Sequence, residues 1–441
     1  MTASPKPDKP VAAPEPEGLA ARRAALTILA LVRDGATLEE ALERARDFAA
    51  LEGADRAFAR ALATAVLRRR GTLDFAIEKF LQRPFGKRGA GVTDILRLGA
   101  AQLLLLETPA HAAVATSVAL ADARQETAGY KGVVNAILRR ISEKGGALIA
   151  DLPARIDTPG WMWRAWERAY GPQVARRIAA AHQDEPALDL TVKDPGAAAA
   201  WAERLGGETT PTGSVRLRKA GAASALDGFD EGAWWVQDMA AALPARLLGD
   251  VAGLRVADLC AAPGGKTLQL AAAGASVTAI DRSAERLERL SQNLERTGLA
   301  AEIVVGDALE HRPAAPYDAV LLDAPCSATG TIRRHPDALW SKAEVDVETL
   351  SNLQTRLLDA AADMLKPGGR LVFCVCSLQR EEGEAQAAAA LQRRADLERL
   401  PIAPEEVGAL PVLTPVGDLR TLPFHGAGMD GFFAARFVKR A

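Results

Sequence analysis

Hydrophobic and polar positions follow two different patterns along the chain. Between residues 19 and 147, apolar side chains recur every three or four positions, as at Ala25, Ile28, Leu29 and Val32, which predicts amphipathic helices packed into a bundle. After residue 246, the apolar positions gather into short runs that are followed by amphipathic stretches. This second pattern is typical of an α/β domain with a doubly wound, mostly parallel sheet.

Two other segments complete the predicted organisation. Residues 1–18 hold five prolines and little apolar content, so we expect a disordered tail that is neither a signal peptide nor a membrane span. Residues 148–245 are expected to form a connecting α+β subdomain with a strand near 188–192 and an aromatic core made by Trp161, Trp163, Trp166 and Tyr170. The predicted domains are therefore 19–147, 148–245 and 246–441.

Acidic residues end the strand-like runs of the last domain. Asp281, Asp307 and Asp323 each follow an apolar run. In open parallel sheets, ligands bind at the carboxyl ends of the strands, where such side chains meet. A single aspartate in this position serves equally well as a helix N-cap. Three in succession favour a binding site.

A glycine turn joins the first of these strands to a helix, in Asp258-Leu-Cys-Ala-Ala-Pro-Gly-Gly-Lys-Thr267. Glycines allow close backbone approach, and a helix N-terminus offers unpaired N–H groups to a polar ligand. A phosphate loop would need a glycine where Cys260 stands, and the dinucleotide pattern of spaced glycines is absent because Gly264 and Gly265 are adjacent. The loop is therefore predicted to cradle a cofactor other than a nucleoside triphosphate or NAD.

The cysteines number only four, namely Cys260, Cys326, Cys374 and Cys376. We expect no disulfide framework, because the cysteines are few in a long chain without a secretory signal. We expect no zinc site either, because no C-x-x-C pair exists and the histidines are scattered. Cys260 and Cys374 are interpreted as buried strand residues. Cys326 and Cys376 follow successive strands, so both thiols should face one cleft if these strands are neighbours.

Paired thiols suit one chemistry on a methyl-donor fold. Carbon 5 of cytosine becomes nucleophilic only after a thiolate has added to carbon 6. After methylation, the carbon-5 proton must be removed and the thiolate expelled. Two thiols and an acid such as Asp323 fit these steps.

The motifs resemble those of the Sun/Fmu family of RNA cytosine-C5 methyltransferases over roughly residues 230–440. They are the glycine turn, Asp323-Ala-Pro-Cys-Ser, Cys376-Ser-Leu, Val236-Gln-Asp-Met, Gly330-Thr-Ile-Arg-Arg-His-Pro-Asp and Asp430-Gly-Phe-Phe. The resemblance implies S-adenosylmethionine as cofactor, Cys376 as nucleophile and Cys326 as an aid to breakdown of the adduct. One departure is Val375, where the family usually has threonine. We expect the geometry to survive, although valine cannot bond as the threonine hydroxyl does.

The same resemblance implies a cofactor site. Its residues would be Cys260, Ala261, Ala262, Pro263, Gly264, Gly265 and Lys266 around the methionine part, Asp281 on the ribose, Asp307 near the adenine and Asp323 at the reacting end. Asp323 would also hydrogen-bond the cytosine. Trp234 and Trp235 are expected to pack beside this site. The strand at 188–192 lacks the Arg-Val-Asn that the family uses for RNA contact.

The amino-terminal part resembles the NusB-like RNA-binding domain of bacterial RsmB-type enzymes, in Asp55-Arg-Ala-Phe, Leu96-Arg-Leu-Gly, His111-Ala-Ala-Val and Asn135-Ala-Ile-Leu-Arg-Arg. The whole chain has a net charge of −2, but residues 18–145 hold 20 basic and 14 acidic side chains. Arg68-Arg69-Arg70 and Arg139-Arg140 concentrate this excess. They indicate an RNA-binding face or, equally, ordinary solvated arginines.

The sequence thus predicts a cytoplasmic enzyme that modifies small-subunit ribosomal RNA. We expect it to be a monomer with no metal ion and no membrane partner. Two alternatives stay open. One is a ribosome assembly factor that binds ribosomal RNA without catalysis, because a fold does not establish an activity. The other is a methyltransferase acting on transfer RNA.

Overall fold

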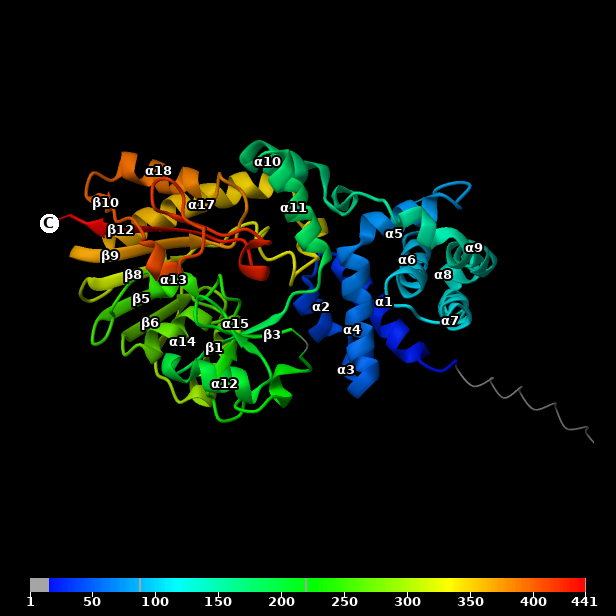
Figure 1. Ribbon diagram of the computed structural model, residues 1–441, viewed down its shortest axis with the longest axis horizontal. Helices are drawn as coiled ribbons and strands as arrows, with labels where there is room; N and C mark the ends of the chain where they lie inside the picture. The colour runs from blue at the N-terminus through cyan, green and yellow to red at the C-terminus, as the bar shows by residue number, and fades with distance from the viewer. Residues whose placement is uncertain (1–15, 87–88, 219, 441) are drawn as a thin grey trace, which may run out of the picture. The chain divides into compact units, whose positions relative to one another are not determined.

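The computed structural model describes residues 16–86, 89–218 and 220–440. The chain divides into two compact units, residues 1–157 and 158–441. Figure 1 colours the chain by residue number, from blue in the first unit to red at the end of the second. The predicted disordered tail lies outside the described residues except for residues 16–18. The predicted division of the second part at residue 245 stays a prediction.

The first unit is helical, as predicted. Its elements are α1 (Leu19–Arg33), α2 (Leu38–Arg44), α3 (Arg46–Ala49), α4 (Gly53–Arg68), α5 (Arg70–Glu78), α6 (Ala90–Leu104), α7 (Ala110–Asp122), α8 (Gln125–Ala128), α9 (Lys131–Ile149) and the short η2 (Ala154–Asp157). The apolar stripe of α1 is buried, with Ala25 and Ile28 fully covered. Helix α2 begins with a capping box, in which the Thr37 hydroxyl accepts from the Glu40 backbone N–H and the Glu40 carboxylate accepts from the Thr37 N–H.

Helices α6 and α9 pack closely because Gly99 has no side chain. A Cβ at Gly99 would lie 2.4 Å from Leu138 Cδ1 on α9. At the end of the unit, the Asp157 carboxylate accepts hydrogen bonds from the backbone N–H and the hydroxyl of Thr72, at 2.7 and 2.8 Å. These bonds fasten η2 to α5.

The second unit begins with helices and a small sheet. Its first elements are α10 (Gly160–Tyr170), α11 (Pro172–Gln183), β1 (Leu188–Val192), η3 (Pro195–Ala197), α12 (Ala198–Arg204), β2 (Glu208–Thr209), β3 (Val215–Leu217), η4 (Ala223–Ala225) and β4 (Trp234–Val236). The strand order is β2-β3-β1-β4, and each pair is antiparallel. The predicted strand at 188–192 is therefore confirmed. Trp163 and Trp166 are buried, as expected of core residues.

The large sheet has the order β10-β12-β9-β8-β5-β6-β7, with β11 paired to β12. The strands are β5 (Arg255–Leu259), β6 (Ser276–Asp281), β7 (Glu302–Val305), β8 (Tyr317–Asp323), β9 (Leu365–Val375), β10 (Leu397–Arg399), β11 (Leu419–Arg420) and β12 (Phe433–Lys439). Strands β7, β6, β5, β8 and β9 are parallel to one another, whereas β12 runs antiparallel to β9. The doubly wound, mostly parallel sheet predicted from the sequence is confirmed.

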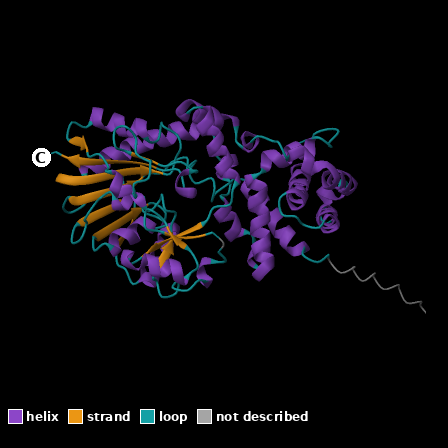
Figure 2. Ribbon diagram, viewed as in Figure 1, coloured by secondary structure: helices purple, strands orange, loops and turns teal. Residues whose placement is uncertain are grey.

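Helices cover both faces of this sheet, as Figure 2 shows by the purple ribbons on either side of the orange strands. The remaining helices are α13 (Leu243–Arg246), α14 (Gly265–Ala272), α15 (Ala284–Thr297), α16 (Ala338–Ser341), α17 (Glu344–Asp363), α18 (Glu384–Arg393), η5 (Pro404–Val407) and η6 (His425–Ala427). Leu322 and Phe373 share a core cluster with residues of α17 and α18, whereas Leu321 and Val372 pack with α13 and α14. Because strand side chains alternate between faces, neighbouring residues enter opposite cores.

Candidate active site

The carboxyl ends of the central strands lie at one edge of the sheet. Leu259 of β5 pairs with Ile280 of β6 and Leu322 of β8, and Asp323 pairs with Cys374 of β9. Since these strands are parallel and in register, the loops that follow them emerge together. The candidate site residues from the sequence lie at these strand ends, in the loops that follow them, in the adjoining first turn of α14 or, for Asp307, beyond the end of β7.

The glycine turn after β5 has an unusual backbone. Cys260 has a positive φ of 61° and Gly264 a φ of 107°. Cys260 therefore lies beyond the end of β5, so its interpretation as a strand residue was wrong, because the chain must reverse there to enter α14. At Gly264 a Cβ would meet Leu290 Cδ1 at 2.3 Å, so both the conformation and the space require glycine.

Asp281 holds this turn in place from the end of β6. Its carboxylate is buried and accepts hydrogen bonds from the backbone N–H of Ala262 at 3.1 Å and of Ser283 at 3.0 Å. The guanidinium of Arg286 contacts the same carboxylate and the carbonyl oxygen of Ala262. Oδ2 accepts from both Ala262 and Arg286, whereas Oδ1 accepts from Ser283 and keeps a lone pair that could accept from a ligand hydroxyl.

Asp307 lies beyond β7, next to this arrangement. The backbone N–H of Gly306 donates to the carbonyl oxygen of Asp281 at 3.0 Å, which brings the two strand ends together. The Asp307 carboxylate accepts from the N–H of Leu309 at 2.9 Å and is partly exposed. The expected ribose and adenine residues are thus neighbours.

Lys266, in the first turn of α14, reaches the end of β8. Its ammonium donates to Asp323 Oδ2 at 2.7 Å, and it lies 5.2 Å from the centre of the Phe432 ring. Burial lowers the pKa of this ammonium, but the Asp323 carboxylate outweighs burial and raises the pKa above its ordinary value. The lysine is therefore charged at neutral pH.

The two candidate catalytic thiols lie side by side. Strands β8 and β9 are neighbours, and Cys326 Sγ is 3.5 Å from Cys376 Sγ. A hydrogen bond with Cys376, together with burial, raises the pKa of the Cys326 thiol well above its ordinary value. Cys374, by contrast, is fully buried in β9, as predicted, and burial raises the pKa of its thiol. Val375 is buried in the core beneath α17 and α18.

Residues from three of the weaker motifs meet beside Cys376. Arg334 forms an ion pair with Asp430, whose carboxylate is completely buried, and the backbone N–H of Asp430 donates to Asp238 Oδ1 at 3.0 Å. Burial raises the pKa of the Asp430 carboxyl to about 7. The Cys376 side chain packs against Met239, Met429 and Phe432 of the same segments. In the sequence these motifs support only the resemblance to the family. The contacts between them are set by the tertiary structure.

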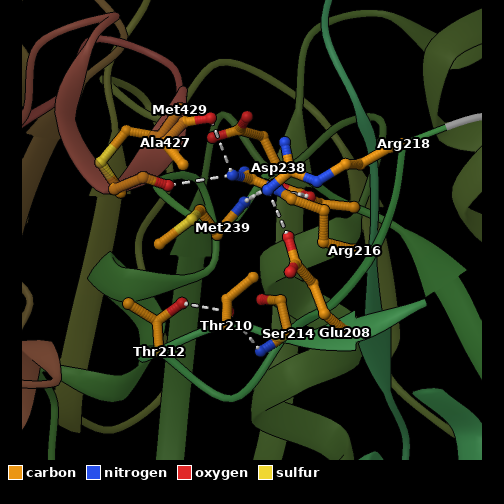
Figure 3. A network of polar contacts seen from close by, with 12 residues as sticks. Glu208, Thr210, Thr212, Ser214, Arg216, Arg218, Asp238, Met239, Ala427 and Met429 are labelled. Atoms are coloured by element: carbon orange, nitrogen blue, oxygen red, sulfur yellow. Dashed lines mark hydrogen bonds and ion pairs between the residues drawn. The ribbon is translucent and has the colours of Figure 1, made fainter. Parts of the chain in front are cut away.

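A buried ion pair ties the small sheet to this region. Arg216 of β3 donates to both carboxylate oxygens of Asp189 on β1 at 2.7 Å, and it donates to the carbonyl oxygen of Gly426 at 2.9 Å. Figure 3 shows the Arg216 side chain near Met239 and Ala427. The N–H of Met239 donates to Asp189 Oδ2 at 3.1 Å. Asp189 therefore bonds to other residues of the protein itself. It lies in the strand that was expected to carry the RNA-contacting motif of the family.

The two tryptophans of β4 divide between two cores. Trp235 packs with Ala261 and Ala262 of the glycine turn, as expected. Trp234 was expected there as well, but this was wrong because it is buried in the core of the small sheet. Alternation along the strand places them on opposite faces.

In the first unit, the arginine cluster at 68–70 is not a free basic face. Arg68 is buried, Arg69 pairs with Asp157 at 2.9 Å, and Arg70 lies 3.8 Å from Asp74. Asp157 and Asp74 therefore offset much of the positive charge of the cluster. Asp157 is distant from the cluster in sequence. The side chains of Arg139 and Arg140 on α9 are exposed.

Within the described residues, no helix is long and apolar enough to cross a membrane. Across the same ranges, no three His, Cys, Asp or Glu side chains gather in a way that could hold a metal ion.

Solved structures share the fold. A structure of the protein PH0851 aligns over 98% of this chain and 100% of its own length, with a TM-score of 0.76 and 22% identity. A methyltransferase homolog protein from Pyrococcus horikoshii aligns over 63% of this chain and 93% of its own, with a TM-score of 0.53 and 26% identity.

Sequence comparison identifies the family. The model described as 16S rRNA methyltransferase RsmB/F matches residues 246–438, and the NusB family model matches residues 19–143. Ribosomal RNA small subunit methyltransferase B of Xanthomonas campestris is 38% identical over 408 residues, covering 87% of this chain and 90% of the relative. The protein of that name from Erwinia tasmaniensis is 35% identical, covering 95% and 98%. The chain therefore belongs to the 16S rRNA methyltransferase RsmB/F family and carries a NusB family domain ahead of its methyltransferase domain.

Proposed function

We propose that the protein transfers a methyl group from S-adenosylmethionine to carbon 5 of a cytosine in 16S ribosomal RNA, through a covalent bond between Cys376 and carbon 6. The observation that carries the proposal is the 3.5 Å separation of the Cys326 and Cys376 sulfurs at the cofactor edge of the sheet. Methylation of a ring nitrogen, an exocyclic amine or a ribose hydroxyl needs no thiol. Activation of carbon 5 calls for one thiolate, and a second thiol beside it can assist the later breakdown of the adduct.

The loops at this edge fit the cofactor. The glycine turn from Cys260 to Lys266 leads into the start of α14, where backbone N–H groups can bind the carboxylate of the methionine part. Asp281 Oδ1 has a lone pair available for a ribose hydroxyl, and Asp307 lies next to it for the adenine. When bound, S-adenosylmethionine supplies an electrophilic methyl group. Lys266 and Asp323 link this turn to the thiol loops.

The chain's own residues account for the steps at sulfur. A cytosine must leave its stack to reach the pocket. The Cys376 sulfur adds to carbon 6, and the electron pair this releases makes carbon 5 nucleophilic, with Asp323 hydrogen-bonded to the base. After the methyl group has been transferred, a base accepts the carbon-5 proton, the electron pair of that C–H bond restores the ring double bond, and the Cys376 sulfur leaves. Cys326 assists this last step.

The raised pKa of the Cys326 thiol supports this division of roles. A thiol that keeps its proton at neutral pH is a poor nucleophile, but it can donate a hydrogen bond to a neighbouring thiolate. Cys326 lies within hydrogen-bond distance of Cys376 and can support the sulfur as it leaves. Cys376 is then the residue whose sulfur adds to the base, as the family resemblance implies.

The test is transfer of labelled methyl from S-adenosylmethionine to unmodified 16S ribosomal RNA, with wild type, Cys376→Ala and Cys374→Ala compared. We expect 5-methylcytidine from wild type, none from Cys376→Ala, and retained transfer by Cys374→Ala. Cys374 is fully buried in β9, and its weak thiol bond to Asp323 Oδ1, at 3.4 Å, leaves the bond of Lys266 to Oδ2 in place when it is lost. Equal transfer by Cys376→Ala and wild type would overturn the role of the nucleophile.

The same assay separates the alternatives. Tight RNA binding without label, on naked RNA and on immature subunits alike, would favour a non-catalytic assembly factor. Label on transfer RNA in place of ribosomal RNA would change the substrate and leave the chemistry intact.

A further inference from the structure

A fully buried carboxyl group lies beside the two thiols. Glu382 is in the loop between β9 and α18, and it has no exposed surface. Its Oε1 accepts from the backbone N–H of Ser327 at 2.8 Å, and its Oε2 accepts from the hydroxyls of Ser327 and Ser377, each at 2.5 Å. Glu382 lies outside all of the sequence motifs described above.

The two serines that bond the Glu382 carboxyl are the direct neighbours of the two thiol residues. Ser327 directly follows Cys326, and Ser377 directly follows Cys376. One carboxylate therefore joins the loop after β8 to the loop after β9, immediately beyond the residues that bear the thiols. We name the Glu382 carboxyl together with Ser327 and Ser377 the serine clamp.

Helix α17 supports the clamp from a third direction. Gln354 Nε2 donates to the carbonyl oxygen of Pro325 at 2.9 Å and to Glu382 Oε1 at 3.2 Å. Pro325 immediately precedes Cys326. The backbone on both sides of Cys326 is thus anchored to Glu382 or to its partner.

Strand pairing alone does not fix this region. The register between β8 and β9 ends at the pair Asp323 and Cys374. Beyond that pair, the backbone N–H of Ala324 bonds to Cys374 O and that of Gly330 to Cys376 O. Between these two points, the Thr329 hydroxyl accepts from the N–H of Leu378 at 3.0 Å, and hydrogen bonds from Ser327 and Ser377 to Glu382 add a link next to the thiols themselves. The clamp therefore contributes to the relative position of the thiols.

A buried carboxyl group is a costly way to stabilise a fold. Burial raises the pKa of Glu382, which reflects the penalty for its charged form. Apolar side chains of similar volume generally stabilise a core at least as well as buried charges do. What the carboxyl provides in addition is directional bonding to two loops at once, because one oxygen can accept from both hydroxyls.

We propose that Glu382 is a positioning residue that holds the Cys326 and Cys376 thiols in register for formation and breakdown of the cytosine adduct. The proposal rests on the proposed function, since it assigns the two sulfurs to one covalent cycle. Displacement of a reacting group by about 1 Å can lower a rate about 100-fold. Loss of the clamp should therefore slow the steps at sulfur while the cofactor loop, held by Asp281 and Lys266, stays intact.

The experiment measures formation of the covalent adduct with RNA that contains 5-fluorocytidine, in the presence of S-adenosylmethionine. Fluorine at carbon 5 cannot leave as a proton does, so the adduct accumulates and its rate of formation can be followed on a denaturing gel. The variants are Glu382→Ala, Glu382→Gln and the control Glu381→Ala, whose side chain is exposed.

We expect Glu382→Ala to slow adduct formation roughly 10-fold to 100-fold, with the Kd for S-adenosylmethionine within about twofold of wild type. Glutamine keeps the shape and can bond both hydroxyls, so Glu382→Gln should recover much of the rate. Glu381→Ala should match wild type. General destabilisation would weaken cofactor binding as well, which separates it from loss of positioning.

An adduct rate for folded Glu382→Ala equal to that of wild type would overturn the positioning role alone. If Glu382→Ala does not fold, Gln354→Ala replaces it, and an unchanged rate for this variant would overturn the role equally. Absence of any adduct with wild type would instead overturn the proposed function, and the positioning role with it.

Discussion

Lys266 Nζ lies 2.7 Å from Asp323 Oδ2, which joins the first turn of α14 to the carboxyl end of β8. The lysine side chain is 9% exposed and the aspartate 29%. This pair connects the glycine turn with the loop that carries Cys326. It is therefore a direct link between the expected cofactor residues and the thiols.

Replacing Lys266 with methionine should weaken cofactor binding and stability together. The change leaves the Asp323 carboxylate without its partner in a partly buried place, at a cost of about 1–3 kcal/mol. We expect at least a tenfold rise in the Kd for S-adenosylmethionine, measured by calorimetry. Lys366→Met is the matched control, because Lys366 pairs with Asp318 at the opposite end of β8, where half of the lysine side chain is exposed. An unchanged Kd for Lys266→Met would remove this lysine from the cofactor site.

Cys326→Ala should leave the protein covalently attached to its RNA. If Cys326 assists departure of the Cys376 sulfur, its loss slows breakdown of the adduct more than its formation. A band of protein bound to unmodified RNA should then accumulate on a denaturing gel, with multiple turnover reduced about tenfold or more. The double variant with Cys376→Ala should show no band. Free RNA with Cys326→Ala, at full turnover, would contradict the assigned role.

Gly330→Ala should destabilise the methyltransferase domain. A Cβ at Gly330 would lie 1.8 Å from the carbonyl oxygen of Gly431, which is backbone and cannot rotate away. We expect a loss of about 2–4 kcal/mol in the free energy of unfolding, measured with urea. Gly306→Ala is the control, since the nearest atom to its Cβ would be Val304 Cγ1 at 3.9 Å. Equal midpoints for the two variants would show that the two segments separate easily.

Stability should depend on pH through Asp258. This carboxyl is 1% exposed, and burial raises its pKa to about 7. The folded state thus binds a proton that the unfolded chain releases near pH 4, so the contribution is fully present below about pH 4 and is lost as the pH rises to about 7.

Asp258→Asn removes this titration. Relative to the variant, the wild-type free energy of unfolding should fall by roughly 2–4 kcal/mol between about pH 4 and pH 7 and change little above that. Glu185→Gln, at an exposed site, should follow wild type throughout. Parallel curves for wild type and Asp258→Asn would contradict the raised pKa.

Much of the candidate site could be predicted because its residues stand in local patterns. Asp281 and Asp323 end apolar runs, and parallel strands bring such ends to one edge whatever the loops contain. The proximity of Cys326 and Cys376 needed one further condition, that β8 and β9 are neighbours, and the structure meets it.

Contacts between distant segments could not be predicted in this way. Glu382 has no pattern that distinguishes it from the exposed Glu381 beside it, and only its burial against Ser327 and Ser377 gives it a role. The pairing of Arg69 with Asp157 could not be predicted for the same reason, because the two residues lie 88 positions apart.

The sequence by itself determined the order of helices and strands, the sheet edge that carries the acids and the thiols, and the family, because periodicity and motifs depend on near neighbours. Only the tertiary structure decided which polar groups share a buried environment, and hence the raised pKa of Cys326, the pairing of Arg334 with Asp430 and the serine clamp. Burial and hydrogen bonding depend on which segments meet in space, and that is a property of the whole packed chain.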